Sequence, residues 1–160
     1  MQHAHVSIIG ARLGHHSRSI KGRTMESVNR FIVHDLESFP VVWSRRSAIK
    51  PGYAAQWENE MDALLKGEQP FVIIFEEGQP DETHDDRKTR GLWLKRNKHG
   101  LGGLCKAVVA IEPDAIKRTA LKAQSALAAK AFGVAMEIVA SKEAAQTLAR
   151  QLLAHAGGDA

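Results

Sequence analysis

The sequence predicts an α/β domain with a small mixed, largely parallel sheet and flanking helices, in the order ββαβαβαβα. The chain has 160 residues, of which 44% are hydrophobic and 25% charged, which is typical of one globular domain. Short apolar runs alternate with longer segments that carry helix start and stop signals. Strands separated by helices are expected to lie parallel, whereas two strands joined by a short turn form an antiparallel hairpin.

The domain is expected to span residues 28–155 and to begin with that hairpin. Its strands are predicted at 31–33 and 41–43, with the turn at 38–40. A helix is predicted at 50–66, because a proline lies near its start, a glycine follows its end, and apolar residues recur three or four positions apart. Those apolar residues are Tyr53, Trp57, Met61 and Leu64.

The middle of the domain continues the alternation of strands and helices. Residues 71–75 are all apolar, which predicts a strand covered by helices on both faces. A helix with a brief apolar patch is predicted at 83–99. The glycine-rich residues 100–103 follow that helix and enter a strand, whereas a phosphate-binding loop leaves a strand and opens a helix. We therefore interpret 100–103 as a turn.

The last part of the domain contains two strands and two helices. The strands are predicted at 105–111 and 136–139, and the alanine-rich helix between them at 114–132, where Gly133 ends it. Ser141 is expected to cap a final helix that runs to about residue 155. Residues 156–160 are interpreted as a flexible C-terminus.

The first 24 residues differ from the rest, and we interpret 1–24 as a disordered tail. They carry four basic residues, no acidic residue and four histidines, without strand or helix periodicity. Met25 stands where the patterned domain begins, so either Met1 or Met25 is the start of the working protein. The histidines of the tail are His3, His5, His15 and His16.

Composition limits the classes of function. The longest apolar runs have about five residues, far fewer than the roughly 20 that span a bilayer, so no transmembrane segment is expected. The single cysteine, Cys105, is expected to be buried in a strand and fits a reducing, cytoplasmic location. Residues 87–106 carry seven basic side chains and no acid. Nucleic-acid binding is nevertheless not expected, because no aromatic-and-arginine pattern of an RNA module accompanies them.

Several segments together resemble a known family. The order of elements resembles the SpoIIAA-like group of STAS-related domains over roughly 28–155. The matching segments are Leu-Leu-Lys-Gly at 64–67, Pro-Phe-Val-Ile-Ile at 70–74, a basic helix at 90–98 and Leu-Cys-Lys-Ala-Val-Val at 104–109. The resemblance implies a small sheet-and-helix domain, as in anti-sigma-factor antagonists, that acts through partners rather than through chemistry.

The loop after the central strand departs from that family. Phosphorylatable antagonists carry an Asp-Ser-Ser-Gly-like motif there, whereas residues 76–86 contain no serine, and only Thr83 could take its role. Thr83 is also placed to cap the following helix, with Asp86 three residues on. A phosphate on Thr83 would be attracted by the helix dipole and by Arg87, and repelled by the neighbouring carboxylates.

These observations favour a non-enzymatic regulatory or interaction module, without a cofactor or catalytic residues. A protein partner is preferred, and a small apolar ligand or a lipid is the lesser alternative. The interaction surface is expected on the basic helix, because arginine and tryptophan most often dominate interface energetics. Its residues are Arg87, Arg90, Trp93 and Arg96, although packing in the core is the preferred interpretation of Trp93.

A metal-dependent enzyme is the rival interpretation. Acidic residues follow several predicted strands, and carboxylate oxygens at strand ends can bind Mg²⁺ for phosphoryl transfer or form a receiver-like site. The candidate ligands are Glu76, Glu77, Asp85 and Asp86. Two histidines of the domain, His34 and His99, have no evident partner in the sequence.

Overall fold

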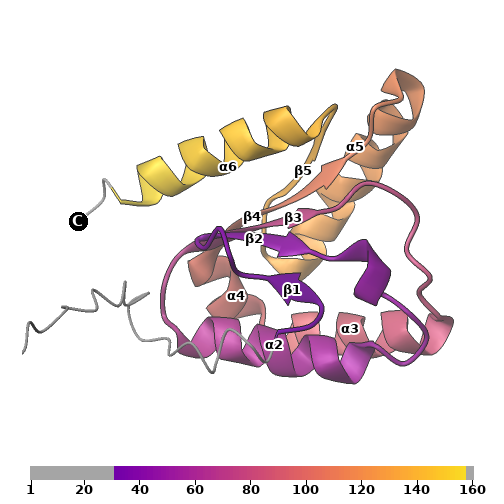
Figure 1. Cartoon of the computed structure of the whole chain (residues 1–160), viewed down its shortest axis with the longest axis vertical. Coiled ribbons are helices and arrows are strands. Elements are labelled where there is room, and N and C mark those ends of the chain that lie inside the picture. The colour runs from indigo at the N-terminus through magenta and orange to yellow at the C-terminus, as the bar shows by residue number, and fades with distance from the viewer. Residues whose placement is uncertain (1–30, 158–160) are drawn as a thin grey trace, which may run out of the picture.

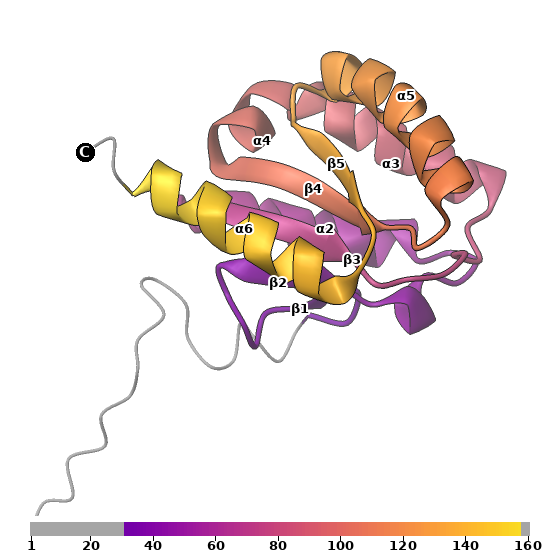
Figure 2. The same cartoon turned by 90° about the horizontal axis from the view of Figure 1, so that it is seen from above.

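The chain forms an α/β structure around a five-stranded mixed sheet, with helices on both faces (Figures 1 and 2). The structure is a computed structural model and describes residues 31–157. The predicted tail at 1–24 and the last three positions, 158–160, lie outside the described residues. Within the described range, the predicted α/β class with a mixed, largely parallel sheet is confirmed.

The five strands lie in the sheet in the same order as in the chain. The first two form the predicted antiparallel hairpin, and every later pair of neighbours is parallel. The strands are β1 (His34–Asp35), β2 (Val41–Ser44), β3 (Phe71–Phe75), β4 (Cys105–Ile111) and β5 (Met136–Val139). Three of them, β3, β4 and β5, have the bounds that the sequence predicts.

This order determines where the helices lie. Because successive parallel strands follow one another in one direction, right-handed crossovers place all connecting helices on the same face. Figure 2 shows the connecting helices on one face and the final helix alone on the other. The helices are α2 (Ala54–Lys66), α3 (His84–Arg96), α4 (Lys98–Leu104), α5 (Ala115–Phe132) and α6 (Lys142–Ala156), with a 3₁₀ turn η1 (Arg46–Ala48). None of the helices within residues 31–157 has the length and apolar character needed to cross a membrane.

The central strand β3 has apolar clusters on both sides, as its unbroken apolar sequence predicts. Phe71 and Ile73 belong to the cluster beneath α2, α3 and α4. Val72 and Ile74 pack on the opposite face, where α6 contributes two fully buried alanines. The alternation of side chains along a strand therefore divides the core into two layers.

The first strand lies three residues later than predicted. The N–H groups of Ile32 and Val33 both donate to the carboxylate of Glu60, at 3.0 Å. Carbonyl groups of the same segment accept from Nη1 of Arg45, at 3.1 Å for Ile32 and 3.4 Å for Phe31. The segment 31–33 is therefore held largely by side chains rather than by a sheet ladder, which local propensity could not reveal.

The predicted turn at 100–103 is wrong, because these residues lie in the short helix α4. A Cβ atom on Gly102 would lie 2.6 Å from the carbonyl oxygen of Gly133, so only glycine allows these two backbones to approach. Gly133 itself has φ of 69° and ends α5, as predicted. The glycines near residue 102 thus serve packing between elements rather than a reversal of the chain.

Candidate functional site

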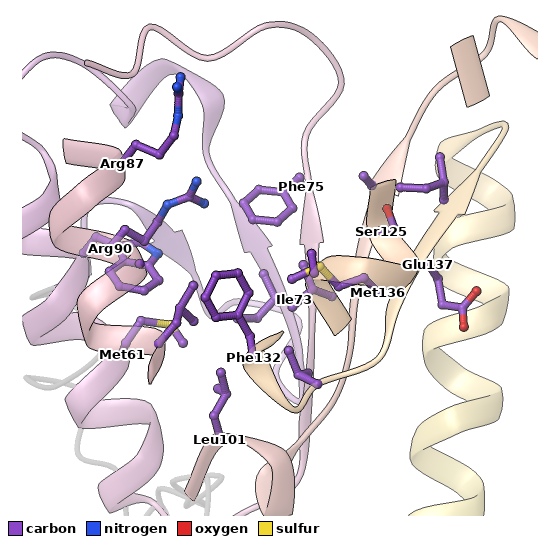
Figure 3. Close-up of a pocket in the computed structure, with 18 of the residues that line it drawn as sticks. Met61, Ile73, Phe75, Arg87, Arg90, Leu101, Ser125, Phe132, Met136 and Glu137 are labelled. Carbon is purple, nitrogen blue, oxygen red and sulfur yellow. The ribbon is translucent and has the colours of Figure 1, made fainter. Parts of the chain in front are cut away.

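A cavity of about 440 Å³ lies between the sheet and helices α3 and α5. Its walls are mainly apolar, and they come from the sheet, chiefly β3, β4 and β5, on one side and from helices α2, α3, α4 and α5 on the other (Figure 3). Wall residues include Ile73, Phe75, Val108 and Met136 from the sheet, Leu94 from α3 and Phe132 from α5. The cavity therefore presents an apolar surface to whatever occupies it.

Two arginines form the polar end of this cavity. Figure 3 shows Arg87 and Arg90 at one end and the buried Leu101 at the other. The side chain of Arg87 is 64% exposed and that of Arg90 is 28% exposed, so this end opens to solvent. The cavity is thus an apolar space with a cationic mouth.

A single carboxylate holds both arginines. Nε of Arg90 lies 3.0 Å from Oε1 of Glu82, and its Nη2 donates to Oε2 at 3.2 Å. Nε of Arg87 donates to Oε2 at the longer distance of 3.5 Å. Two guanidinium groups facing one carboxylate leave a net positive charge, and each guanidinium keeps N–H donors for a ligand.

The hydroxyl of Tyr53 completes this cluster by donating to Oε1 of Glu82 at 2.7 Å. Burial raises the pKa of Tyr53; the positive charge of Arg90 lowers it, and the hydrogen bond to Glu82 raises it again, so the pKa lies above the ordinary value. Tyr53 therefore stays a neutral donor at physiological pH. It fixes Glu82, and Glu82 in turn orients the arginines.

The cavity is too large to be an ordinary packing defect. A sealed and empty space of 440 Å³ would cost roughly 10 kcal/mol at about 24 cal/mol per Å³. That is comparable to the whole stability of a domain, about 5–15 kcal/mol. Interiors are otherwise close-packed, and ligand pockets measure about 300–1,000 Å³. An open apolar cavity of this size is a candidate ligand pocket rather than a packing defect.

Trp93 packs in the core, the interpretation preferred from the sequence, and does not lie on the expected interaction surface. Trp93 is 2% exposed, its Nε1 donates to Oδ1 of Asp62 at 2.8 Å, and its ring meets Trp57 edge-on at 5.2 Å. Arg96 does face solvent, with a side chain 61% exposed and an ion pair of 3.8 Å to Glu58. The four residues predicted as one surface are therefore divided among the core, the cavity mouth and the solvent face of α3.

The capping role predicted for Thr83 is confirmed. Its Oγ1 accepts from the N–H of Asp86 at 3.1 Å and donates to Oδ2 of Asp86 at 2.8 Å. Asp86 also accepts from the N–H groups of Gly52 and Ala54, so one carboxylate joins the starts of α2 and α3. The hydrogen bond from Gly52 is the main cause that lowers the pKa of Asp86. Phosphorylation of Thr83 stays a prediction, and it would have to replace these bonds.

The predicted acidic ligands do not converge on one point. Glu76 accepts from the N–H of Arg46 at 3.1 Å and, with Glu77, borders shallow grooves at the end of β3. Asp86 accepts hydrogen bonds from the backbone at the start of α2, and Asp85 is exposed on the first turn of α3. Between residues 31 and 157 no three His, Cys, Asp or Glu side chains are grouped to hold a metal ion.

A buried polar network was missed from the sequence. Glu60 is 3% exposed, and its carboxylate accepts from His34 Nδ1 at 3.1 Å and from Gln56 Nε2 at 2.7 Å, in addition to three backbone N–H groups. His34, which had no evident partner in the sequence, therefore has one. The sequence does contain a signal for the burial of Glu60, because this residue lies three positions after Trp57 and four before Leu64, on the apolar face of the helix.

The burial of that carboxylate and the hydrogen bonds to it act in opposite directions. Burial raises the pKa of Glu60, but the hydrogen bonds from His34, the backbone of Val33 and Gln56 lower it to about 2. For Cys105 burial outweighs the lowering effect of its backbone hydrogen bonds and of Lys106, so the pKa of its thiol is raised to about 12. Glu60 is therefore charged and structural at neutral pH, whereas Cys105 is buried and protonated, as expected for a core residue.

Comparison with known proteins adds no relative. No family model, no curated protein and no solved structure matches this chain.

Proposed function

We propose that this protein is a binding module whose ligand is a small amphiphile with an apolar body and an acidic head group. The observation that carries the proposal is the apolar cavity of about 440 Å³ with Arg87 and Arg90 at its open end. The module acts through what it binds rather than by catalysis, as the SpoIIAA-like resemblance implies, and that resemblance itself stays a prediction.

The chemistry of the cavity favours an amphiphile over a polar metabolite. A sugar or a nucleotide would lose its hydrogen bonds to water against walls that offer few in return, at a cost of about 1–3 kcal/mol for each unpaired group. A chain of methylene groups gains about 0.8 kcal/mol per buried group. A carboxylate or phosphate on that chain would meet Arg87 and Arg90 at the mouth. A fatty acid is the simplest molecule of this class.

Decanoate is expected to bind more tightly than decanol, because both fill the cavity but only decanoate has a charge for the arginines. Replacing Arg87 by glutamine is expected to weaken decanoate binding about tenfold or more and to leave decanol unchanged, since hydrogen bonds to charged groups contribute about 1.5–3 kcal/mol. Trp57 lines the cavity, so its fluorescence reports binding in a titration. Arg96→Gln is the matched control, because Arg96 is not among the lining residues.

A second variant tests the cavity itself. Ala128 lines the cavity from α5, and Ala128→Trp is expected to fill the space and abolish binding of both molecules without lowering the thermal midpoint. Equal affinity for decanoate and decanol in the wild type, or unchanged decanoate affinity in Ala128→Trp, would show that the proposed ligand or its place is wrong.

A protein partner on the solvent face of α3 is the second candidate, favoured by the exposure of Arg96 and Arg87. Arg96→Ala is expected to reduce capture of an acidic partner at least tenfold, because arginine anchors commonly contribute about 2 kcal/mol. The exposed pair with Glu58 contributes about 0–1 kcal/mol, so the thermal midpoint should hardly move. Affinity purification with each variant measures this, with Arg150→Ala on the opposite helix α6 as control. Equal capture by all variants would place the interface elsewhere.

A further inference from the structure

The outer side of α5 reverses the usual pattern of a surface helix. None of its 18 residues is buried, and its two most exposed large apolar residues are Ile116 at 84% and Leu127 at 73%. Figures 1 and 2 show α5 at the outside of the molecule. The residues that line the cavity, such as Ala128 and Phe132, face the sheet instead. Apolar side chains thus point away from the core. A typical surface helix carries polar side chains on that outer side.

The exposed apolar residues form one stripe. Ile116, Ala120, Ala123 and Leu127 are four, three and four residues apart, so they share one face of the helix. All four are exposed to solvent. Three lysines, Lys117, Lys122 and Lys130, lie beside this stripe, and α5 contains no acidic residue. The helix is therefore amphipathic, with an apolar stripe flanked by cations, on a surface that nothing else in residues 31–157 covers.

The charge around α5 limits what could cover the stripe. Residues 84–132, from the start of α3 to the end of α5, contain eleven basic and four acidic residues, a net charge of +7, whereas the whole chain has +4. A second copy would bring this charge against itself, and residues 1–25 are also basic and free of acid. A nucleic acid would satisfy the lysines but not Ile116 and Leu127. An anionic lipid surface satisfies both, because it offers acidic head groups above an apolar layer.

We propose that α5 is a membrane-docking helix, which lies on an anionic lipid surface with Ile116 and Leu127 inserted and its lysines among the head groups. The observations that carry this are the outward apolar stripe and the one-sided charge of the helix. The proposal does not depend on the cavity ligand, although α5 is also a wall of the cavity, and docking would bring that cavity to the lipid surface.

Co-sedimentation with vesicles tests the proposal. The full chain is expected to bind vesicles of phosphatidylcholine that contain phosphatidylglycerol, and to bind vesicles of phosphatidylcholine alone at least tenfold more weakly. Replacing Lys117, Lys122 and Lys130 by glutamine is expected to weaken binding to the anionic vesicles about a hundredfold, since each lysine contributes roughly a factor of five. Ile116→Gln with Leu127→Gln keeps the charge and is expected to weaken binding about tenfold.

Ile32→Gln is the matched control, because Ile32 is 59% exposed and precedes β1 at the other edge of the sheet. This variant should bind like the wild type, and circular dichroism should show all variants folded. Absence of binding to anionic vesicles, equal binding to neutral ones, or a dimer that Ile116→Gln with Leu127→Gln dissociates would overturn the proposal. The decanoate titration uses no membrane, so its outcome is independent of this one.

Discussion

Replacing Glu60 by alanine is expected to lower the free energy of unfolding by about 3–5 kcal/mol, the range for removing one partner of a buried charged network. The Glu60 carboxylate accepts three backbone N–H groups and two side-chain donors, and both Glu60 and His34 are almost completely buried. Alanine would leave these donors without a partner and without access to water. Urea denaturation of both proteins at neutral pH measures the difference.

The destabilisation caused by Glu60→Ala is expected to depend on pH. The folded protein lowers the pKa of Glu60 from 4.5 to about 2, which corresponds to about 3 kcal/mol of stability at neutral pH. Because the folded pKa is the lower one, this stability is present above about pH 4.5 and is lost as the pH falls toward 2. The difference between wild type and Glu60→Ala should therefore shrink over that interval.

Glu58 provides the matched control for this experiment. It lies two residues earlier on α2, and its ion pair within residues 31–157 is the 3.8 Å contact with the exposed Arg96. Glu58→Ala is expected to change the free energy of unfolding by less than about 1 kcal/mol. If Glu58→Ala and Glu60→Ala destabilise the protein equally, or if the effect of Glu60→Ala does not depend on pH, the network does not hold the start of the sheet.

Replacing Trp93 by alanine is expected to lower the free energy of unfolding by about 3–5 kcal/mol through the cavity that it leaves. Trp93 is among the largest fully buried side chains, packs edge-on against Trp57 and donates to Asp62. Its loss removes the ring contact with Trp57 between α2 and α3 and leaves Asp62 without this donor. Thermal and urea denaturation measure the effect.

Leu92→Ala is the control for Trp93, because Leu92 precedes it in the same helix but is 48% exposed. We expect less than about 1 kcal/mol for that substitution. Trp93→Phe should lie between the two, since it keeps an aromatic ring, although a smaller one, and loses the bond to Asp62. A stable Trp93→Ala protein that has lost only partner binding would restore the interface role that the sequence suggested for Trp93.

Local patterns were enough to predict most elements but not the site. The unbroken apolar run at 71–75 predicts a strand, and Gly133 predicts the end of a helix. Both predictions are confirmed. The cavity unites residues from β3, β4, β5, α3 and α5, which are far apart in the chain. The chemistry of arginine predicts a binding role for Arg87 and Arg90, whereas their place at the mouth depends on Glu82, Tyr53 and the position of α5. Sequence periodicity describes single elements, so it does not predict which distant residues lie close together in the fold.

What the sequence determined by itself was the α/β class, the hairpin, the bounds of three strands and the caps at Thr83 and Ser141. These follow from apolar periodicity and from side chains that bond to backbone within a few residues. Only the tertiary structure decided that residues 31–33 bind Glu60 and Arg45, that Gly102 lies against Gly133, and that Trp93 meets Trp57 and Asp62. Each of these contacts joins residues that are more than ten positions apart in the chain, most of them about 30. Such a contact stabilises the protein only after the chain has brought the two segments together.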